Sequence, residues 1–290
     1  NIFSKLGDFE KAGFNREKSA PPQKNVKDLY GIVPTEASKQ YDMHEVIYRL
    51  VDNSEFDEYK DKYGQSIICG VARIDGWAVG IVANQRKVVK SKKREMQFGG
   101  VIYSDSADKA ARFIMNCNQR KIPLVFLQDV TGFMVGSRSE QGGIIKDGAK
   151  MVNAMSNSVV PKFTVIIGNS YGAGNYAMCG KAYDPRLIVG WPTAQIAVMG
   201  GAQAAKVLLQ IQVSALKSKG KEITKEDETE LLKKITDRYN SQISPYYAAS
   251  RMWLDAVIDP TDTRKWISMG IEAANHAPLT KAYNVGVIQT

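Results

Sequence analysis

Histidine is almost absent from this sequence, which has only His44 and His276 among 290 residues. Most catalytic triads and zinc sites need histidine or paired cysteines. The three cysteines (Cys69, Cys117 and Cys179) lie far apart and form no CxxC pair. We therefore expect no metal site and no hydrolase triad, and we expect each histidine to lie on the surface of a helix. Isolated cysteines in apolar segments predict buried, reduced thiols and a reducing compartment.

Long apolar runs are also lacking. No stretch approaches the roughly 18 uninterrupted apolar residues of a membrane helix, so we expect no contact with a membrane. The segment 1–25 contains no apolar signal core and no initiator methionine, which predicts a trimmed or expressed fragment. The hydrophobic content of 44% and charged content of 24% are typical of a globular protein.

Positive charge is what the sequence has in excess, with a net charge of +9. It is densest in the run Arg86–Arg94, "RKVVKSKKR". This balance suits an anionic partner. The run is predicted either to be a solvated loop or to meet the phosphates of a ligand. The chain lacks a recognisable nucleic-acid-binding motif, so we expect no nucleic acid. The segment 213–228 is similarly rich in charge.

The order of apolar and polar segments predicts a single α/β domain. Residues 1–35 are polar and punctuated by proline, and we expect an arm or linker there, followed by one domain over 36–290. Apolar residues then recur at helical spacing in "YDMHEVIYRLVD". Two strand-like runs meet at Asp75–Gly76, a pair typical of a tight hairpin. Further strands alternate with helices of crossover length, which predicts a parallel sheet.

Two glycine-rich turns follow strands and precede helices. The first lies in residues 128–150 and the second is "IIGNSYGAGNYAMCG", residues 166–180. Unpaired N–H groups at a helix start favour negative charge, and small side chains leave them accessible. Such turns either form an oxyanion hole or allow close packing of a helix on a sheet. Neither matches a dinucleotide fingerprint, a P-loop or a GxSxG nucleophile elbow.

These motifs resemble a known family. The "TGFMVG" and "GAGNY" segments, with their flanking sequence, resemble carboxyltransferase (β) subunits of biotin-dependent acyl-CoA carboxylases, of the methylcrotonyl-CoA and propionyl-CoA carboxylase types. The resemblance covers roughly residues 30–285. It implies a crotonase-like ββα superhelix. Members of this family contain two such halves, and the chain matches the second half, which carries most of the biotin site.

The resemblance implies a catalytic role for main-chain groups. The N–H groups of Ala173 and Gly174 match the pair that binds the ureido oxygen of biotin, and Tyr171 and Gly172 shape that turn. Because the cofactor carries the carboxyl group and also serves as the base, the protein has only to stabilise negative oxygens and hold the reactants together. We expect Gly174→Val to abolish transfer and to leave the fold largely intact.

The first turn contributes the opposite wall of the implied site. Gly132 and Phe133 match residues that line the biotin pocket, and Tyr176 matches a position that helps to set acyl selectivity. Ordinary packing is an equal alternative for Tyr176. Gln128 and Asp129 are expected to support the turn, and proton transfer by Asp129 is the less favoured alternative.

Cofactor and partners follow from the same resemblance. They are biotin on a carrier protein, acyl-CoA, a biotin carboxylase or carrier subunit, the N-terminal carboxyltransferase half and further copies of the chain, in a trimer of domains or a hexamer. The implied location is the cytoplasm, or the mitochondrial matrix in a eukaryote. Three alternatives stay open: a decarboxylase subunit of the glutaconyl-CoA type, a hydratase or isomerase using Asp129 or Glu140, and a module that docks the biotin carrier but is inactive alone.

Overall fold

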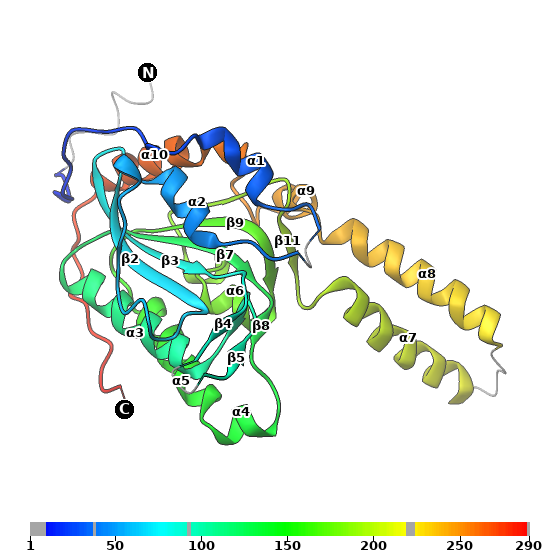
Figure 1. The fold of residues 1–290 in the computed structure, drawn as a ribbon. Helices are drawn as coiled ribbons and strands as arrows, with labels where there is room; N and C mark the ends of the chain where they lie inside the picture. The colour runs from blue at the N-terminus through cyan, green and yellow to red at the C-terminus, as the bar shows by residue number, and fades with distance from the viewer. Residues whose placement is uncertain (1–9, 37–38, 92–93, 219–223, 289–290) are drawn as a thin grey trace.

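The computed structural model describes residues 10–36, 39–91, 94–218 and 224–288. A twisted sheet forms the middle layer, and helices cover both of its faces (Figure 1). The strands are β1 (Asp57–Glu58), β2 (Ile67–Ile74), β3 (Trp77–Asn84), β4 (Val89–Lys90), β5 (Met96–Gln97), β6 (Val101–Ile102), β7 (Leu124–Val130), β8 (Gly132–Phe133), β9 (Lys162–Tyr171), β10 (Leu187–Gly190), β11 (Gln195–Ala197) and β12 (Ala256–Val257). The helices are α1 (Leu29–Ile32), α2 (Met43–Leu50), α3 (Ser104–Gln119), α4 (Ser137–Gln141), α5 (Ile144–Ser156), α6 (Gly172–Ala177), α7 (Gly201–Ser218), α8 (Lys225–Gln242), α9 (Pro245–Ser250) and α10 (Thr263–Asn275).

Within the described residues, the main sheet has the strand order β1-β2-β3-β7-β9-β10-β12, and β11 pairs with the end of β9. Strand β2 pairs antiparallel with both β1 and β3, whereas β3, β7, β9, β10 and β12 pair in parallel along the sheet. The predicted parallel sheet with crossover helices is confirmed. Two small sheets, β4-β5 and β6-β8, lie outside the main sheet.

The hairpin predicted at Asp75–Gly76 is confirmed. Ile74 of β2 pairs with Trp77 of β3, so two residues form the turn. Both have positive φ, 52° for Asp75 and 80° for Gly76. This is the backbone of a type I′ turn, whose twist matches that of the flanking strands.

Alternate side chains of the central strands enter two cores. Val125 and Leu127 of β7 join the cluster that includes α2 and α10, whereas Leu124 and Phe126 join the cluster that includes α3 and α5. This alternation follows from the two-residue period of a strand. The predicted buried face of α2 is confirmed: Met43, Val46, Ile47 and Leu50.

The described part of the predicted arm is not separate from the core. Leu29 is 1% exposed and belongs to the same cluster as α2, together with Phe14 and Val33. Main-chain bonds also tie the segment down, since Glu17 N donates to Gly76 O at 3.0 Å. The expectation of an arm outside the core is therefore wrong for residues 10–35. Polar composition misled it, because the segment contributes only a few large apolar side chains. Residues 1–9 lie outside the described residues.

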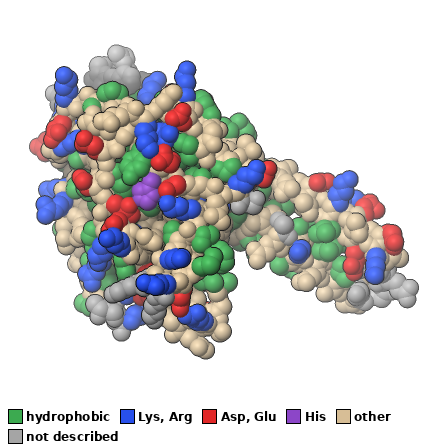
Figure 2. Space-filling model, in the orientation of Figure 1, with side chains coloured by type: hydrophobic (Ala, Val, Ile, Leu, Met, Phe, Trp, Pro, Cys, Tyr) green, Lys and Arg blue, Asp and Glu red, His purple; other side chains and the backbone are tan. Residues whose placement is uncertain are grey.

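Helices α7 and α8 pack on each other and project away from the sheet (Figure 1). The N-terminus of α8 is capped as its sequence indicates: Thr224 Oγ1 accepts from Asp227 N at 3.2 Å. Charged side chains lie along the projecting pair (Figure 2). The charged segment 213–228 falls only partly within this pair, because residues 219–223 lie outside the described residues.

Candidate active site at the carboxyl ends of β7 and β9

The two glycine turns lie side by side at one edge of the sheet. Strands β7 and β9 are parallel neighbours, so both turns leave from their carboxyl ends. After β7 the chain forms β8, where Gly132 pairs with Val101 and Phe133 with Ile102 of β6. After β9 it enters α6 at Gly172. Ligands of open α/β sheets bind at such an edge.

Backbone conformation or close backbone contacts explain three of these glycines. Gly172 has φ +49°, and a Cβ there would lie 2.8 Å from Val198 O. Gly132 has φ +143°, a conformation that other residues rarely adopt. A Cβ on Gly174 would lie 3.1 Å from Gly132 Cα. The second turn therefore packs directly on the first.

The N–H groups of Ala173 and Gly174 lie in the first turn of α6, and neither donates to an acceptor within the described ranges. Tyr171, which precedes them, is 8% exposed, and its hydroxyl donates to Gln195 Oε1 at 2.5 Å. Ala173 itself is exposed, whereas Gly174 is buried. Free N–H groups at this edge have the composition of an oxyanion hole.

An apolar hollow of about 430 Å³ opens beside these groups. It brings together three of the predicted site residues, Phe133, Ala173 and Tyr176. Its other lining residues are mostly apolar: Met134, Val135, Glu140, Ile144, Ile145, Gly148, Ala149 and Val152. The predicted residues Gly132, Tyr171, Gly172 and Gly174 do not line it. They form the turns beneath it.

Gln128 connects the strands below the hollow. Its Oε1 accepts from Ser170 Oγ at 2.6 Å, and its Nε2 donates to Met178 O at 2.6 Å. It therefore bonds both to the strand before α6 and to the chain after α6, as expected of a supporting residue.

Asp129 lies buried next to Gln128, with 4% exposure, and it does not line the hollow. Its Oδ1 accepts from Asn169 N at 2.9 Å, and its Oδ2 accepts from the Tyr41 hydroxyl at 2.9 Å. Burial raises the pKa of Asp129, although the charge of Arg86 and the hydrogen bonds act in the opposite direction. Its position gives it no direct access to a ligand in the hollow.

Sequence reasoning missed Arg86 as a buried residue. It belongs to the basic run predicted to be a solvated loop or to meet ligand phosphates, yet it is 7% exposed and its Nε lies 3.2 Å from Asp129 Oδ2. The available signal was its place two residues after the buried strand β3. Lys87 and Lys90 of the same run are more exposed, and residues 92 and 93 lie outside the described ranges.

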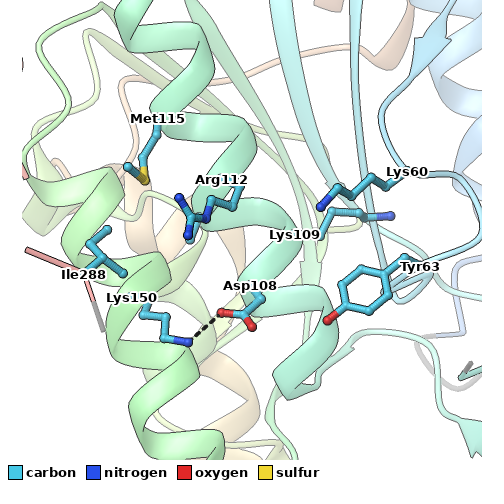
Figure 3. A pocket seen from close by; sticks show the side chains of 9 residues that line it. Lys60, Tyr63, Asp108, Lys109, Arg112, Met115, Lys150 and Ile288 are labelled. Atoms are coloured by element: carbon cyan, nitrogen blue, oxygen red, sulfur yellow. Dashed lines mark hydrogen bonds and ion pairs between the residues drawn. The ribbon is translucent and has the colours of Figure 1, made fainter. Parts of the chain in front are cut away.

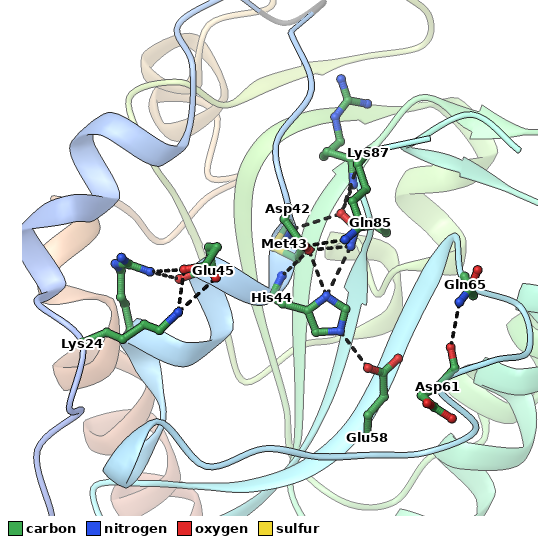
Figure 4. A network of polar contacts seen from close by, with 12 residues as sticks. Lys24, Asp42, Met43, His44, Glu45, Glu58, Asp61, Gln65, Gln85 and Lys87 are labelled. Carbon is green, nitrogen blue, oxygen red and sulfur yellow. Dashed lines mark hydrogen bonds and ion pairs between the residues drawn. The ribbon is translucent and has the colours of Figure 1, made fainter. Parts of the chain in front are cut away.

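His44 is not the simple surface histidine that was expected (Figure 4). Its Nδ1 lies 2.9 Å from Asp42 Oδ1 and its Nε2 lies 2.7 Å from Glu58 Oε2. Burial lowers the pKa of His44, but the hydrogen bonds and charges of Glu58 and Asp42 outweigh it and raise the pKa. His276, which caps the end of α10, has a side chain that is 52% exposed.

A second hollow, of about 250 Å³, lies over α3 and α5 (Figure 3). Charged side chains line much of it, and Lys150 donates to Asp108 at 3.0 Å and to Asp147 at 2.9 Å. None of the predicted site residues lines this hollow.

The cysteines are buried and free, as predicted. Burial raises the pKa of Cys69 to about 12 and that of Cys179 to about 11, so neither thiol is a ready nucleophile. In the described part of the chain, no cluster of three or more histidine, cysteine, aspartate or glutamate side chains has the arrangement of a metal site. No helix among the same residues has the length and apolar character needed to span a bilayer.

Comparison with known proteins places this geometry in context. The family model of the carboxyl transferase domain matches residues 4–286. The chain is 49% identical over 254 residues to the mitochondrial methylcrotonoyl-CoA carboxylase beta chain of Dictyostelium discoideum, a match that covers 88% of this chain and 41% of that protein. It is 45% identical over 278 residues to the biotin-dependent 3-methylcrotonyl-coenzyme A carboxylase beta1 subunit of Mycobacterium tuberculosis, covering 96% of this chain and 50% of that protein.

A solved structure is similar over almost the whole chain. The hexameric transcarboxylase 12S, described with methylmalonyl-coenzyme A and methylmalonic acid bound, superposes with a TM-score of 0.81 at 36% identity. The match covers 97% of this chain and 51% of that chain. The chain thus spans about half the length of the relatives it matches, or somewhat less.

Proposed function

Because the chain belongs to the carboxyl transferase domain family and has its crotonase-like fold, we propose that it forms the biotin-binding half of an acyl-CoA carboxyltransferase. In this proposal the whole enzyme moves a carboxyl group from carboxybiotin to the α- or γ-carbon of an acyl-CoA. In this proposal residues 10–35 are part of the domain, because Phe14, Leu29 and Val33 lie in its core.

The single observation that carries this proposal is the pair of free N–H groups of Ala173 and Gly174 beside an apolar hollow. The ureido oxygen of biotin is a strong acceptor, and the ring system of biotin is otherwise largely apolar. A hollow of about 430 Å³ lies within the usual size of small-molecule sites. The N–H donors, the apolar walls and the volume of the hollow are therefore all suited to a bound biotin.

Bound carboxybiotin would supply both the carboxyl group and the base of the reaction. The chain's own residues supply position and electrostatics. The N–H groups of Ala173 and Gly174 would donate to the ureido oxygen, whose negative charge increases during transfer, and fixed donors stabilise such charge without reorganising. Gly132 and Gly172 hold those donors in place through their backbone conformations.

The walls of the hollow would exclude water and orient the ligand. Phe133 forms one wall, and its ring lies so close to α5 that a Cβ on Gly148 would be 2.7 Å from Phe133 Cε1. Tyr176 stands on the opposite helix, 49% exposed, and would contact the acyl group. A dry site strengthens the hydrogen bonds made inside it.

The remaining partners are part of the same proposal. The acyl-CoA would bind chiefly to the N-terminal half, and a biotin carrier or biotin carboxylase subunit would deliver the cofactor. Val135 and Ile145, at 74% and 76% exposure, lie at the hollow and are suited to be covered by such a partner. We further propose an oligomer, and a location in the cytoplasm or the mitochondrial matrix.

Reconstitution tests the proposal. The chain would be assayed alone and together with the N-terminal carboxyltransferase half, with free carboxybiotin and several acyl-CoAs. We expect transfer only when both halves are present. Turnover by the chain alone would overturn the half-site account. Loss of the carboxyl group without net transfer would favour a decarboxylase, and binding of the biotin carrier without any turnover would favour a docking module.

A further inference from the structure

The hydrogen-bond ladder between β7 and β9 breaks at Asp129. Gln128 pairs with Ile166, whereas Val130 pairs with Ser170. Three residues of β9 therefore lie opposite Asp129 alone, and a regular main-chain partner is lost there. Both glycine turns begin within a few residues of this break.

The side chain of Asp129 takes the place of the missing main-chain partner. Its Oδ1 accepts from Asn169 N at 2.9 Å, and its own N–H donates to Asn84 Oδ1 at 3.2 Å. Gly168 leaves room for the carboxylate, because a Cβ there would lie 2.5 Å from Asp129 Oδ2. One carboxylate therefore joins the strands that carry the two turns.

Arg86 supplies the compensating charge and bonds to the main chain beside Gly100, which in turn bonds to the first turn. Its Nε lies 3.2 Å from Asp129 Oδ2, and its Nη1 donates to Gly99 O at 3.4 Å. The adjacent Gly100 O accepts from Thr131 N at 2.8 Å, immediately before Gly132. With side chains 7% and 5% exposed, Arg86 and Asp129 form a buried pair. Loss of either partner would leave an uncompensated charge.

We propose that Asp129 is a positioning residue that sets the spacing of the two glycine turns, and that Arg86 compensates its buried charge. The claim that this spacing matters for carboxyl transfer rests on the proposed function. The claim that Asp129 sets the spacing rests on the structure alone. Asp129 acts through Asn169 and the main chain.

The charges around Asp129 determine how the pair responds to pH. Burial raises the pKa of Asp129, and the charge of Arg86 is the first of the influences that lower it. The other titratable groups near it are the hydroxyls of Tyr41 and Tyr171, and a neutral hydroxyl does not replace a cation. Glu36 and Lys39, which line the small cavity beside Asp129, pair with each other at 3.1 Å. Without Arg86, the pKa of Asp129 is therefore expected to rise further.

Three variants test the proposal in the assembled carboxyltransferase: Arg86→Met, Asp129→Asn and the double variant. Each single variant leaves one buried partner uncompensated. In the double variant both charges are gone, and the amide oxygen of Asn can still accept from Asn169 N. Lys234→Met serves as a control, because it removes a paired lysine on α8, a helix that projects away from the sheet (Figure 1).

Hydrogen exchange of segment 166–174 and the pH profile of kcat are the readouts. We expect faster exchange in both single variants. We also expect kcat to fall about 100-fold, because a small displacement of the N–H donors from their productive positions lowers the rate by about that factor. The KM for acyl-CoA should change little. In Arg86→Met, kcat should recover as pH falls, because protonation of Asp129 removes the uncompensated buried charge. The double variant should return to wild-type exchange and to nearly wild-type kcat, and Lys234→Met should match wild type throughout.

Two results would overturn the proposal. Unchanged exchange in both single variants would show that Asp129 does not set the spacing. A double variant with wild-type exchange but lost kcat would show that the carboxylate itself takes part in the chemistry. Should the single variants fail to fold, Tyr41→Phe removes one donor and no charge, and faster exchange at 166–174 is again expected. If the wild-type enzyme shows no transfer, the proposed function fails, while the exchange data still test the spacing.

Discussion

Gly174 and Gly132 lie against each other, such that a Cβ on Gly174 would be 3.1 Å from Gly132 Cα and 3.2 Å from Gly132 N. The two glycine turns are therefore one packed unit and not two independent loops. A change in either turn moves the other.

This contact alters the expected effect of Gly174→Val. The same Cβ would lie 2.6 Å from Val130 Cγ2, so the substitution overpacks the turns as well as covering the N–H donors. We predict loss of transfer and a destabilisation of about 1–3 kcal/mol, the usual cost of overpacking. Urea unfolding and the transfer assay measure the two effects separately.

Ala173→Val is the matched control for that prediction. Ala173 is exposed at the hollow, so its larger side chain should weaken the binding of biotin with little change in the unfolding free energy. Normal transfer by Gly174→Val, or equal destabilisation by both variants, would contradict the packing argument.

Tyr176 is predicted to influence the choice of acyl group. Its ring meets the edge of Tyr183 at 5.8 Å between centroids and borders the hollow. Tyr176→Ala should enlarge the space and shift kcat/KM toward bulkier acyl-CoAs by about 10-fold, as expected for a change in apolar fit. Tyr176→Phe keeps the ring and should behave as wild type. An unchanged preference in Tyr176→Ala would show that the residue has only a packing role.

The pH dependence of stability should reflect His44. Its pKa is raised in the folded state by Glu58 and Asp42, so its contribution is fully present below the unfolded-state pKa of about 6.5. The contribution is lost as pH rises through the folded-state pKa. We predict that the difference in unfolding free energy between wild type and His44→Gln decreases as pH rises from about 6.5 through the folded-state pKa. His276→Gln controls for loss of an exposed imidazole, and a difference that stays constant with pH would contradict the prediction.

The hairpin turn at Gly76 holds the N-terminal segment. A Cβ on Gly76 would lie 2.1 Å from Glu17 O, and Gly76 also has φ +80°. Gly13 has a similar φ of +75° with nothing within 4 Å of an added Cβ. Gly13→Ala should therefore cost only about 1–2 kcal/mol of backbone strain, and Gly76→Ala clearly more. Thermal unfolding measures the loss of stability in each variant. Equal losses would contradict the proposed contact between Gly76 and the main chain of Glu17.

Local patterns predicted much of this fold. The hairpin at Asp75–Gly76 and the buried face of α2 depend on neighbouring residues, whose periodicity is visible in the chain. The capped start of α8 at Thr224 is another such signal. Each of these features depends only on residues that are close together in the sequence.

Features that join distant segments were not predictable in this way. Arg86 meets Asp129, and His44 meets Glu58, only because the fold brings these segments together. The break in the β7-β9 ladder is likewise a property of the pairing and not of either strand. For the site, local sequence indicated the glycine turns, but their direct contact required the three-dimensional structure.

A structure of the protein with biotin bound tests the central claim most directly. The proposal predicts the ureido oxygen within about 3 Å, the length of a hydrogen bond, of the N atoms of both Ala173 and Gly174. It also predicts the ring system in the hollow beside Phe133. Biotin bound elsewhere, or bound in the hollow with its ureido oxygen turned away from these N–H groups, would contradict it.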